Sequence, residues 1–174
     1  MIQSYDDYKY YLEADRLSMG EKRVRPQLIG QDVWKFQRLL RKLEYYQNCK
    51  RSILYKPIKQ ILTIKFHILS VRLGFSIPTN VFGPGLNIAH RGTIIVNGFS
   101  KIGKNCRVHA CVNIGTKGGY TNIAPTIGDN VYILHSRPLI TRSAGLPPGH
   151  GTAALAHPVS HPPEVLFPGI QSIQ

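Results

Sequence analysis

The feature of this sequence that most limits its fold is a six-residue spacing of apolar side chains between residues 76 and 133. Two steps of eight and thirteen residues interrupt the spacing, which otherwise connects Phe82, Ile88 and Ile94; Ile102, Val108 and Ile114; and Ile127 and Ile133. A repeated hexapeptide is typical of a parallel β-helix, in which each unit supplies one short strand and one turn. Glycine and asparagine between these positions suit turns that need positive φ.

The first 75 residues have the periodicity of helices instead. We expect three helices, over residues 8–17, 32–48 and 57–73. Ser4 and Asp7 form a capping-box pattern ahead of the first, and Pro57 suits the first turn of the third, which Gly74 would end. The middle helix carries an apolar stripe at three- and four-residue spacing, made by Val33, Phe36, Leu40 and Leu43.

Beyond Ile133 the composition changes abruptly. Seven of the twelve prolines and four of the seven histidines lie after this residue. Because proline cannot donate to a strand ladder, we expect an irregular segment that does not extend the β-helix. We interpret residues 134–174 as an aberrant tail, such as a frameshift would produce. The predicted fold is therefore α+β: helices over 1–75, a parallel β-helix of hexapeptide repeats over 76–133, and an irregular C-terminal tail over 134–174.

The net charge of +13 is concentrated in the helical part. Its basic residues are Lys22, Arg23, Arg25, Lys35, Arg38, Arg41, Lys42, Lys50, Arg51, Lys56, Lys59, Lys65 and Arg72. Such charge attracts nucleic acid, anionic lipid or an anionic cofactor, but a solvated helical surface is the simplest interpretation. The sequence has no nucleic-acid-binding motif, so we expect no nucleic acid partner. Weak association with an anionic membrane surface stays open.

Three observations bear on the compartment. No apolar run reaches the roughly 18–20 residues that span a bilayer, and the residues after Met1 form neither a basic nor an apolar leader. The three cysteines lack C-x-x-C spacing, so we expect neither a disulfide framework nor a metal site. These patterns favour the cytoplasm.

Three stretches resemble a known family. They are GPGLNIAHRGTIIV at 83–96, IGKNCRVHACVNIGTKGG at 102–119 and APTIGDNVYI at 124–133. Together they resemble the serine acetyltransferase branch of the hexapeptide acyltransferases. The resemblance implies a left-handed β-helix that assembles as a homotrimer, with acetyl-CoA bound in clefts between neighbouring copies. It implies acetyl transfer to the hydroxyl of serine, a step of cysteine biosynthesis. Shorter relatives in bacterial surface-polysaccharide clusters imply a sugar hydroxyl as the acceptor.

His90 falls on the family's His-x-Gly motif, whose histidine is the general base. An alcohol is a poor nucleophile at neutral pH, and an imidazole with a pKa of about 6.5 can take its proton. The alternative is a turn histidine bonded to the backbone. The neighbouring Arg91 and Gly92 are expected to contact the acceptor. His109 has no counterpart in the motif, so we assign it a structural role.

Two further groups of residues have roles that can be predicted, one from the resemblance and one from the hexapeptide spacing. The loop Gly115, Thr116, Lys117, Gly118 and Gly119 resembles the one that shapes the acetyl-CoA cleft, where glycines let the backbone approach the ligand and a lysine can meet a phosphate. Cys106 and Cys111 lie at strand positions, so we expect both in the core rather than acting as nucleophiles.

The sequence also departs from the family. Ala89 stands where the serine enzymes carry an aspartate before the base, and Ile123-Ala124-Pro125 stands where they carry Arg-His-Pro. Without that guanidinium a serine carboxylate lacks its natural partner. The acceptor is therefore either serine or a sugar hydroxyl, and a non-catalytic β-helix scaffold is the competing hypothesis.

Overall fold

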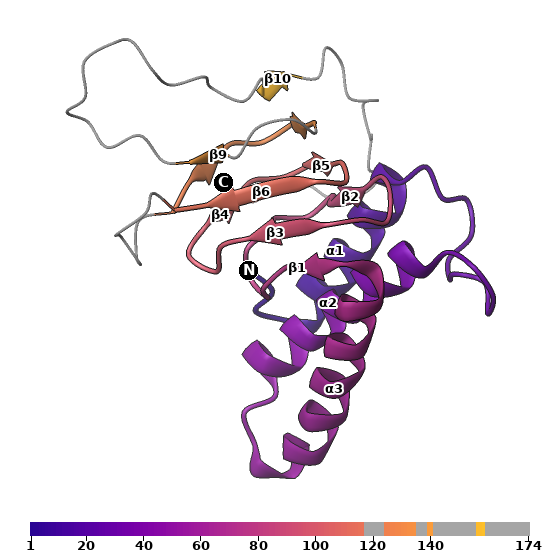
Figure 1. Ribbon diagram of the computed structural model, residues 1–174. Helices are drawn as coiled ribbons and strands as arrows, with labels where there is room; N and C mark the ends of the chain where they lie inside the picture. The colour runs from indigo at the N-terminus through magenta and orange to yellow at the C-terminus, as the bar shows by residue number, and fades with distance from the viewer. Residues whose placement is uncertain (117–123, 135–138, 141–155, 159–174) are drawn as a thin grey trace, which may run out of the picture.

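The computed structural model describes residues 1–116, 124–134, 139–140 and 156–158. The chain begins with the helices α1 (Tyr5–Ser18), α2 (Asp32–Cys49) and α3 (Lys56–Leu73), the last preceded by the short 3-10 helix η1 (Ile53–Tyr55). Short strands follow. In Figure 1 the helices lie on one side, against the first strands, and the later strands stack away from them.

The three predicted helices are confirmed, and their ends have the predicted chemistry. The Ser4 hydroxyl accepts a hydrogen bond from the Asp7 N–H at 3.0 Å, and the Asp7 carboxylate accepts one from the Ser4 N–H at 3.0 Å. This reciprocal capping box satisfies two N–H groups that the first turn of a helix leaves unpaired. Gly74 ends α3 with a φ of 79°, which a residue with a side chain rarely adopts.

The strands form three parallel ladders. Ladder A contains β1 (Phe75–Ser76), β3 (Ile94–Val96), β6 (Val112–Gly115) and β9 (Leu139–Ile140). Ladder B contains β4 (Lys101–Ile102) and β7 (Thr126–Ile127), with Phe82 bridged to Ile102. Ladder C contains β2 (Asn87–Ile88), β5 (Arg107–Val108) and β8 (Val131–Ile133), and β10 (Ala156–Pro158) pairs antiparallel with β8.

From β1 to β9 the chain visits these ladders in the constant order A, B, C. Each of the eight hexad positions lies on a ladder: Phe82, Ile102 and Ile127 on B; Ile88, Val108 and Ile133 on C; Ile94 and Ile114 on A. Seven of them are at most 5% exposed, and the eighth, Ile127, is partly buried against the same core. Burying such side chains is worth about 1.5–3 kcal/mol each, so the hexad positions contribute substantially to the stability of the fold. The α+β class and the order of helices followed by parallel strands are confirmed.

The two irregular steps of the repeat occupy equivalent places. Both the eight-residue step after Ile94 and the thirteen-residue step after Ile114 connect ladder A to ladder B. Extra residues are therefore inserted at one corner only. At the corner between ladders B and C, Asn105 and Asn130 have φ values of 52° and 57°, and the Asn105 amide donates to the Asn130 side-chain oxygen at 2.9 Å.

Close stacking of the coils explains the glycine at position 83, which lies against Gly103 of the next coil. A Cβ at Gly83 would lie 2.7 Å from the carbonyl oxygen of Gly103. No side chain fits there without moving the backbone, so the glycine after Phe82 is a packing requirement.

The expectation that the repeat stops at Ile133 is wrong, because one further strand, β9, continues it. Leu139, six residues later, pairs in parallel with Ile114 of β6, and Ile140 pairs with Gly115. Ladder A therefore receives a fourth strand from the segment that the sequence analysis treats as irregular. The rest of that expectation concerns residues that lie largely outside the described ranges.

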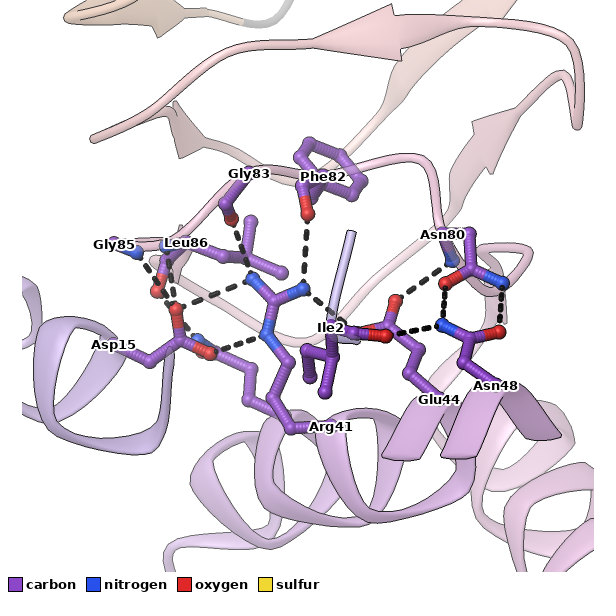
Figure 2. Close-up of polar contacts among 11 residues, drawn as sticks. Ile2, Asp15, Arg41, Glu44, Asn48, Asn80, Phe82, Gly83, Gly85 and Leu86 are labelled. Atoms are coloured by element: carbon purple, nitrogen blue, oxygen red, sulfur yellow. Dashed lines mark hydrogen bonds and ion pairs between the residues drawn. The ribbon is translucent and has the colours of Figure 1, made fainter. Parts of the chain in front are cut away.

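A buried arginine joins the helices to the first strands (Figure 2). Arg41 of α2 is 0% exposed, and each of its five N–H groups has an acceptor. Two go to the Asp15 carboxylate at 2.8 and 3.2 Å, and one goes to Glu44 at 3.0 Å. The other two go to the carbonyl oxygens of Phe82 at 3.0 Å and Gly83 at 2.6 Å.

The partners of Arg41 bind the same stretch of backbone. Asp15 Oδ1 accepts the N–H groups of Gly85 at 2.9 Å and Leu86 at 2.8 Å, and Glu44 Oε1 accepts that of Asn80 at 2.7 Å. Gln37, also buried, donates to the Leu86 carbonyl. Helical side chains thus supply the hydrogen bonds that the first turn of the ladders cannot obtain from a preceding one. The assignment of Arg41 to a solvated basic surface is wrong for this residue.

None of the helices in the described part of the chain is long and apolar enough to cross a membrane.

Replacing Arg41 by methionine should lower the free energy of unfolding by about 3–5 kcal/mol, because it leaves two buried carboxylates and two carbonyl groups without their donor. The measurement is urea unfolding followed by circular dichroism. The matched control is Lys42→Met on the same helix, where the side chain is exposed and the change should stay within about 0.5 kcal/mol. Equal stability of the two variants would contradict the assigned role.

Candidate active site

His90 lies at the corner that connects β2 of ladder C to β3 of ladder A, and its side chain is exposed. Backbone hydrogen bonds hold the corner on both sides of it. The Ala89 N–H donates to the Val108 carbonyl at 2.9 Å, and the Gly92 N–H donates to the Leu73 carbonyl at 3.2 Å. The backbone of the corner is therefore fixed while the imidazole stays accessible to a substrate.

Gly92 is required by this corner. Its φ is 139°, and a Cβ there would lie 2.9 Å from the Cβ of Ala110 in the next coil. Arg91 points along the surface, where its guanidinium lies 3.8 Å from the Asp32 carboxylate at the start of α2. The arginine side chain is 69% exposed, so this pair adds little stability.

His109 lies beside His90, one coil further along the ladder. The centroids of the two rings are 5.2 Å apart, and their planes meet at 75°. On the other side of His109, its Nε2 shares a hydrogen bond with the hydroxyl of Tyr132 in β8. The three side chains form a column across three coils, which we call the His90 column.

The register of ladder C produces this column. Ile88 pairs with Val108, and Val108 pairs with Ile133. The first of these steps is twenty residues, which places His109 level with Ala89, the residue directly before His90 at the same corner. The family motif gives no hint of this contact. The available signal was the twenty-residue offset between Ile88 and Val108, which brings His109 beside the Ala89–His90 turn.

The environment of His109 favours the neutral imidazole. Partial burial lowers the pKa of His109, and the nearby His90 and Arg107 lower it further. Arg107 also lies over the Tyr132 ring, 5.5 Å from its centroid. A cation close to a histidine disfavours the protonated form of the ring.

The proposed acetyl-CoA loop is only partly described. Gly115 ends β6 and Thr116 follows it, both partly exposed, whereas Lys117, Gly118 and Gly119 lie outside the described residues. His90 precedes β3 and Gly115 ends β6, so the two positions lie at opposite ends of ladder A. A strand of three or four residues separates them by roughly 10 Å. Among the described residues, a single copy does not bring Gly115 and Thr116 to His90.

The cysteines have different surroundings. Cys106 is 1% exposed, and burial raises the pKa of its thiol to about 12, so it is a core residue and a poor nucleophile. Cys111 is exposed and has a φ of 60°, which corrects the expectation that it lies in the core. Within the described ranges, no three His, Cys, Asp or Glu side chains form a group that could hold a metal ion.

In the segments where the sequence departs from the family it resembles, Ala89, Ala124 and Pro125 lie within the described residues. Ala89 is fixed by its backbone hydrogen bond, and the Pro125 carbonyl accepts the Lys101 N–H at 3.2 Å. Ile123 lies outside the described residues, and Ala124 is partly exposed. At these described positions, no carboxylate directly precedes His90. They also provide no guanidinium that could pair with the carboxylate of serine.

The fold consists of helices that cap a stack of short parallel strands, and this arrangement can be compared with solved structures. Among solved structures, the chain is similar to the serine acetyltransferase of Brucella abortus strain S19, with a TM-score of 0.54 at 16% sequence identity. The match covers 73% of this chain and 51% of that one, so the chain spans about half the length of the structure it resembles. No protein-family model and no curated protein matches the chain. The fold is thus serine-acetyltransferase-like.

Replacing Arg107 by glutamine should raise the pKa of His109, because it removes a positive charge that disfavours the imidazolium. The pKa is measured by following the ring resonances of His109 through an NMR pH titration. Lys104→Gln, a loss of the same charge from an exposed turn in the same coil, should leave it nearly unchanged. A pKa that does not respond to Arg107→Gln would contradict the electrostatic account.

Proposed function

We propose that this protein is an O-acetyltransferase that moves the acetyl group of acetyl-CoA to a hydroxyl group, with His90 as the general base. The observation that carries the proposal is the His90 column at an accessible corner of a serine-acetyltransferase-like fold. An exposed imidazole on a fixed backbone can take a proton from a substrate that approaches from solvent.

The chemistry needs no covalent intermediate on the enzyme. The acceptor oxygen forms a bond to the thioester carbonyl carbon, and the carbon–sulfur bond breaks. The hydroxyl proton passes to His90 and then to the departing sulfur. Removing this proton as the bond forms is typically worth a factor of about 10²–10⁴ in rate.

His109 is the positioning residue in this proposal. Its ring packs edge-on against His90, and its bond to Tyr132 fixes the orientation of the imidazole. A neutral His109 avoids repelling the imidazolium that forms on His90 during proton transfer. In the serine enzymes that the sequence resembles, an aspartate precedes the base; in this chain a neighbour from the next coil would orient the ring instead.

The acetyl-CoA site in this proposal is formed between two copies. His90 and the loop from Gly115 to Gly119 lie at opposite ends of ladder A in one copy. In a homotrimer of closed, left-handed β-helices, as the resemblance implies, the loop of one copy faces the His90 corner of the next. Arg91 and Gly92 would then contact the acceptor. Protein of this kind would work in the cytoplasm, where acetyl-CoA is available.

The acceptor is a small molecule with a hydroxyl group, either serine or a sugar. Ala89 and Ala124 stand where the serine enzymes place groups that hold serine, which favours a sugar of a surface glycan over the amino acid. With serine as the acceptor, the product would feed cysteine biosynthesis.

His90→Asn should lower turnover by a factor of about 10²–10⁴, because the side chain keeps its size but cannot accept the proton at neutral pH. Release of the CoA thiol is measured with serine and with a panel of sugars. His67→Asn, on the outward side of α3, is the matched control and should keep full activity. Undiminished turnover in His90→Asn would refute the base assignment, and absence of turnover with every acceptor would favour the scaffold hypothesis.

Lys117→Ala should raise the KM for acetyl-CoA by about tenfold while kcat changes little, because a lost phosphate contact weakens substrate and transition state equally. Initial rates are measured at varied acetyl-CoA and saturating acceptor. Lys101→Ala removes an exposed lysine from a neighbouring strand and should leave the KM unchanged. If both variants behave as wild type, the loop does not bind the cofactor.

A further inference from the structure

The outward face of α3 is apolar and uncovered. Leu54 in η1 and Ile61, Ile64, Ile68 and Val71 in α3 are 79%, 52%, 58%, 60% and 67% exposed. Their spacing of three and four residues places the α3 members in one stripe along the helix. The opposite face is also apolar and packs inward, through Leu62, Phe66, Leu69 and Leu73. Only one of the two apolar faces of α3 therefore has a partner within the described part of this chain.

The charges around this face all have one sign. From residue 50 to residue 73 the chain carries six basic residues and no aspartate or glutamate: Lys50, Arg51, Lys56, Lys59, Lys65 and Arg72. Lys65 and Arg72 each follow a stripe residue by four positions and so border the stripe on one side. On the other side, a shallow hollow is lined by Lys56, Lys59, Gln60, Thr63 and Ile64.

We infer that this face, α3 together with η1, binds an anionic lipid surface and lies in the plane of the membrane interface. An apolar stripe bordered by lysine and arginine matches both the acyl chains and the negative headgroups of such a surface. The isoleucines would enter the acyl boundary, and the long basic side chains would reach out to the headgroup phosphates.

Charge complementarity favours lipid over a second copy of the chain. If the face paired with itself, the six cations of one copy would approach the six of the next, and residues 50–73 contain no carboxylate to compensate them. An anionic membrane supplies the apolar layer and the negative charge together. In Figure 1, α3 runs from its C-terminal end beside β1 to an N-terminal end that lies away from the strands. The inference does not depend on the proposed catalytic activity.

The test is flotation of the full chain with vesicles of equal parts phosphatidylglycerol and phosphatidylcholine, at about 0.1 M salt. Wild type should float with these vesicles and much less with pure phosphatidylcholine. Ile64→Gln with Ile68→Gln should lower the partition coefficient on the order of tenfold or more, because it removes two side chains from the acyl boundary. Lys56→Gln with Lys65→Gln should lower it by a similar factor on the anionic vesicles only.

Two matched controls separate this face from general basicity. Leu28→Gln with Ile29→Gln changes two exposed aliphatic residues in the other basic region, and Lys101→Gln with Lys104→Gln removes the same charge from the strands. Both should bind vesicles within about twofold of wild type. All of the substituted side chains are exposed or outward-facing, and circular dichroism checks that the helices persist.

Three results would overturn the inference. The first is a wild-type chain that does not float with anionic vesicles. The second is a control pair that loses binding as strongly as the α3 pairs. The third comes from sedimentation velocity without lipid: if Ile64→Gln with Ile68→Gln dissociates an oligomer of the wild type and leaves vesicle binding intact, the face joins copies of the chain instead.

Discussion

A stack of parallel strands has a first edge whose N–H and C=O groups have no preceding strand to bond. In this protein the buried guanidinium of Arg41 and its two carboxylate partners supply those bonds. Arg41 donates to the carbonyls of Phe82 and Gly83, while Asp15 and Glu44 accept from Gly85, Leu86 and Asn80. Every later coil takes its register from this one, because each strand pairs with the strand one coil before it. The helices therefore act as the template on which the ladders begin.

The parts of this arrangement that the sequence predicts are those that repeat. Six-residue spacing requires no knowledge of distant partners, and it correctly identified the interior positions from Phe82 to Ile133. The helices were equally predictable from the sequence, because the capping box of Ser4 and Asp7 and the stripe through Phe36 and Leu40 are local patterns. The same method failed at Leu139, where the abundance of proline outweighed a position that is again in phase.

Pairs that are distant along the chain escaped prediction. Arg41 and Asp15 are 26 residues apart, and Arg41 and Gly83 are 42 apart. Composition alone assigns such an arginine to the surface, because an arginine is rarely buried unless it is fully paired. Cys111 failed for a different reason: its φ of 60° belongs to a turn, and a turn residue can directly precede a buried strand such as Val112–Gly115. The neighbourhood of His90 likewise depended on a register that only the folded ladder sets.

This dependence on register also changes how the missing aspartate before His90 should be judged. In a stacked ladder, the side chains near a given residue come from the next coil, which here begins about twenty positions further along the chain. Ala89 provides no polar neighbour in sequence, but His109 is a neighbour of His90 in the fold, and Tyr132 in turn is bonded to His109. An imidazole oriented by contacts across coils is rigid only if the coils keep their register, and that register starts at the bonds of Arg41. The chemistry proposed for the His90 corner therefore depends on the polar network that Arg41 forms between the helices and the first strands.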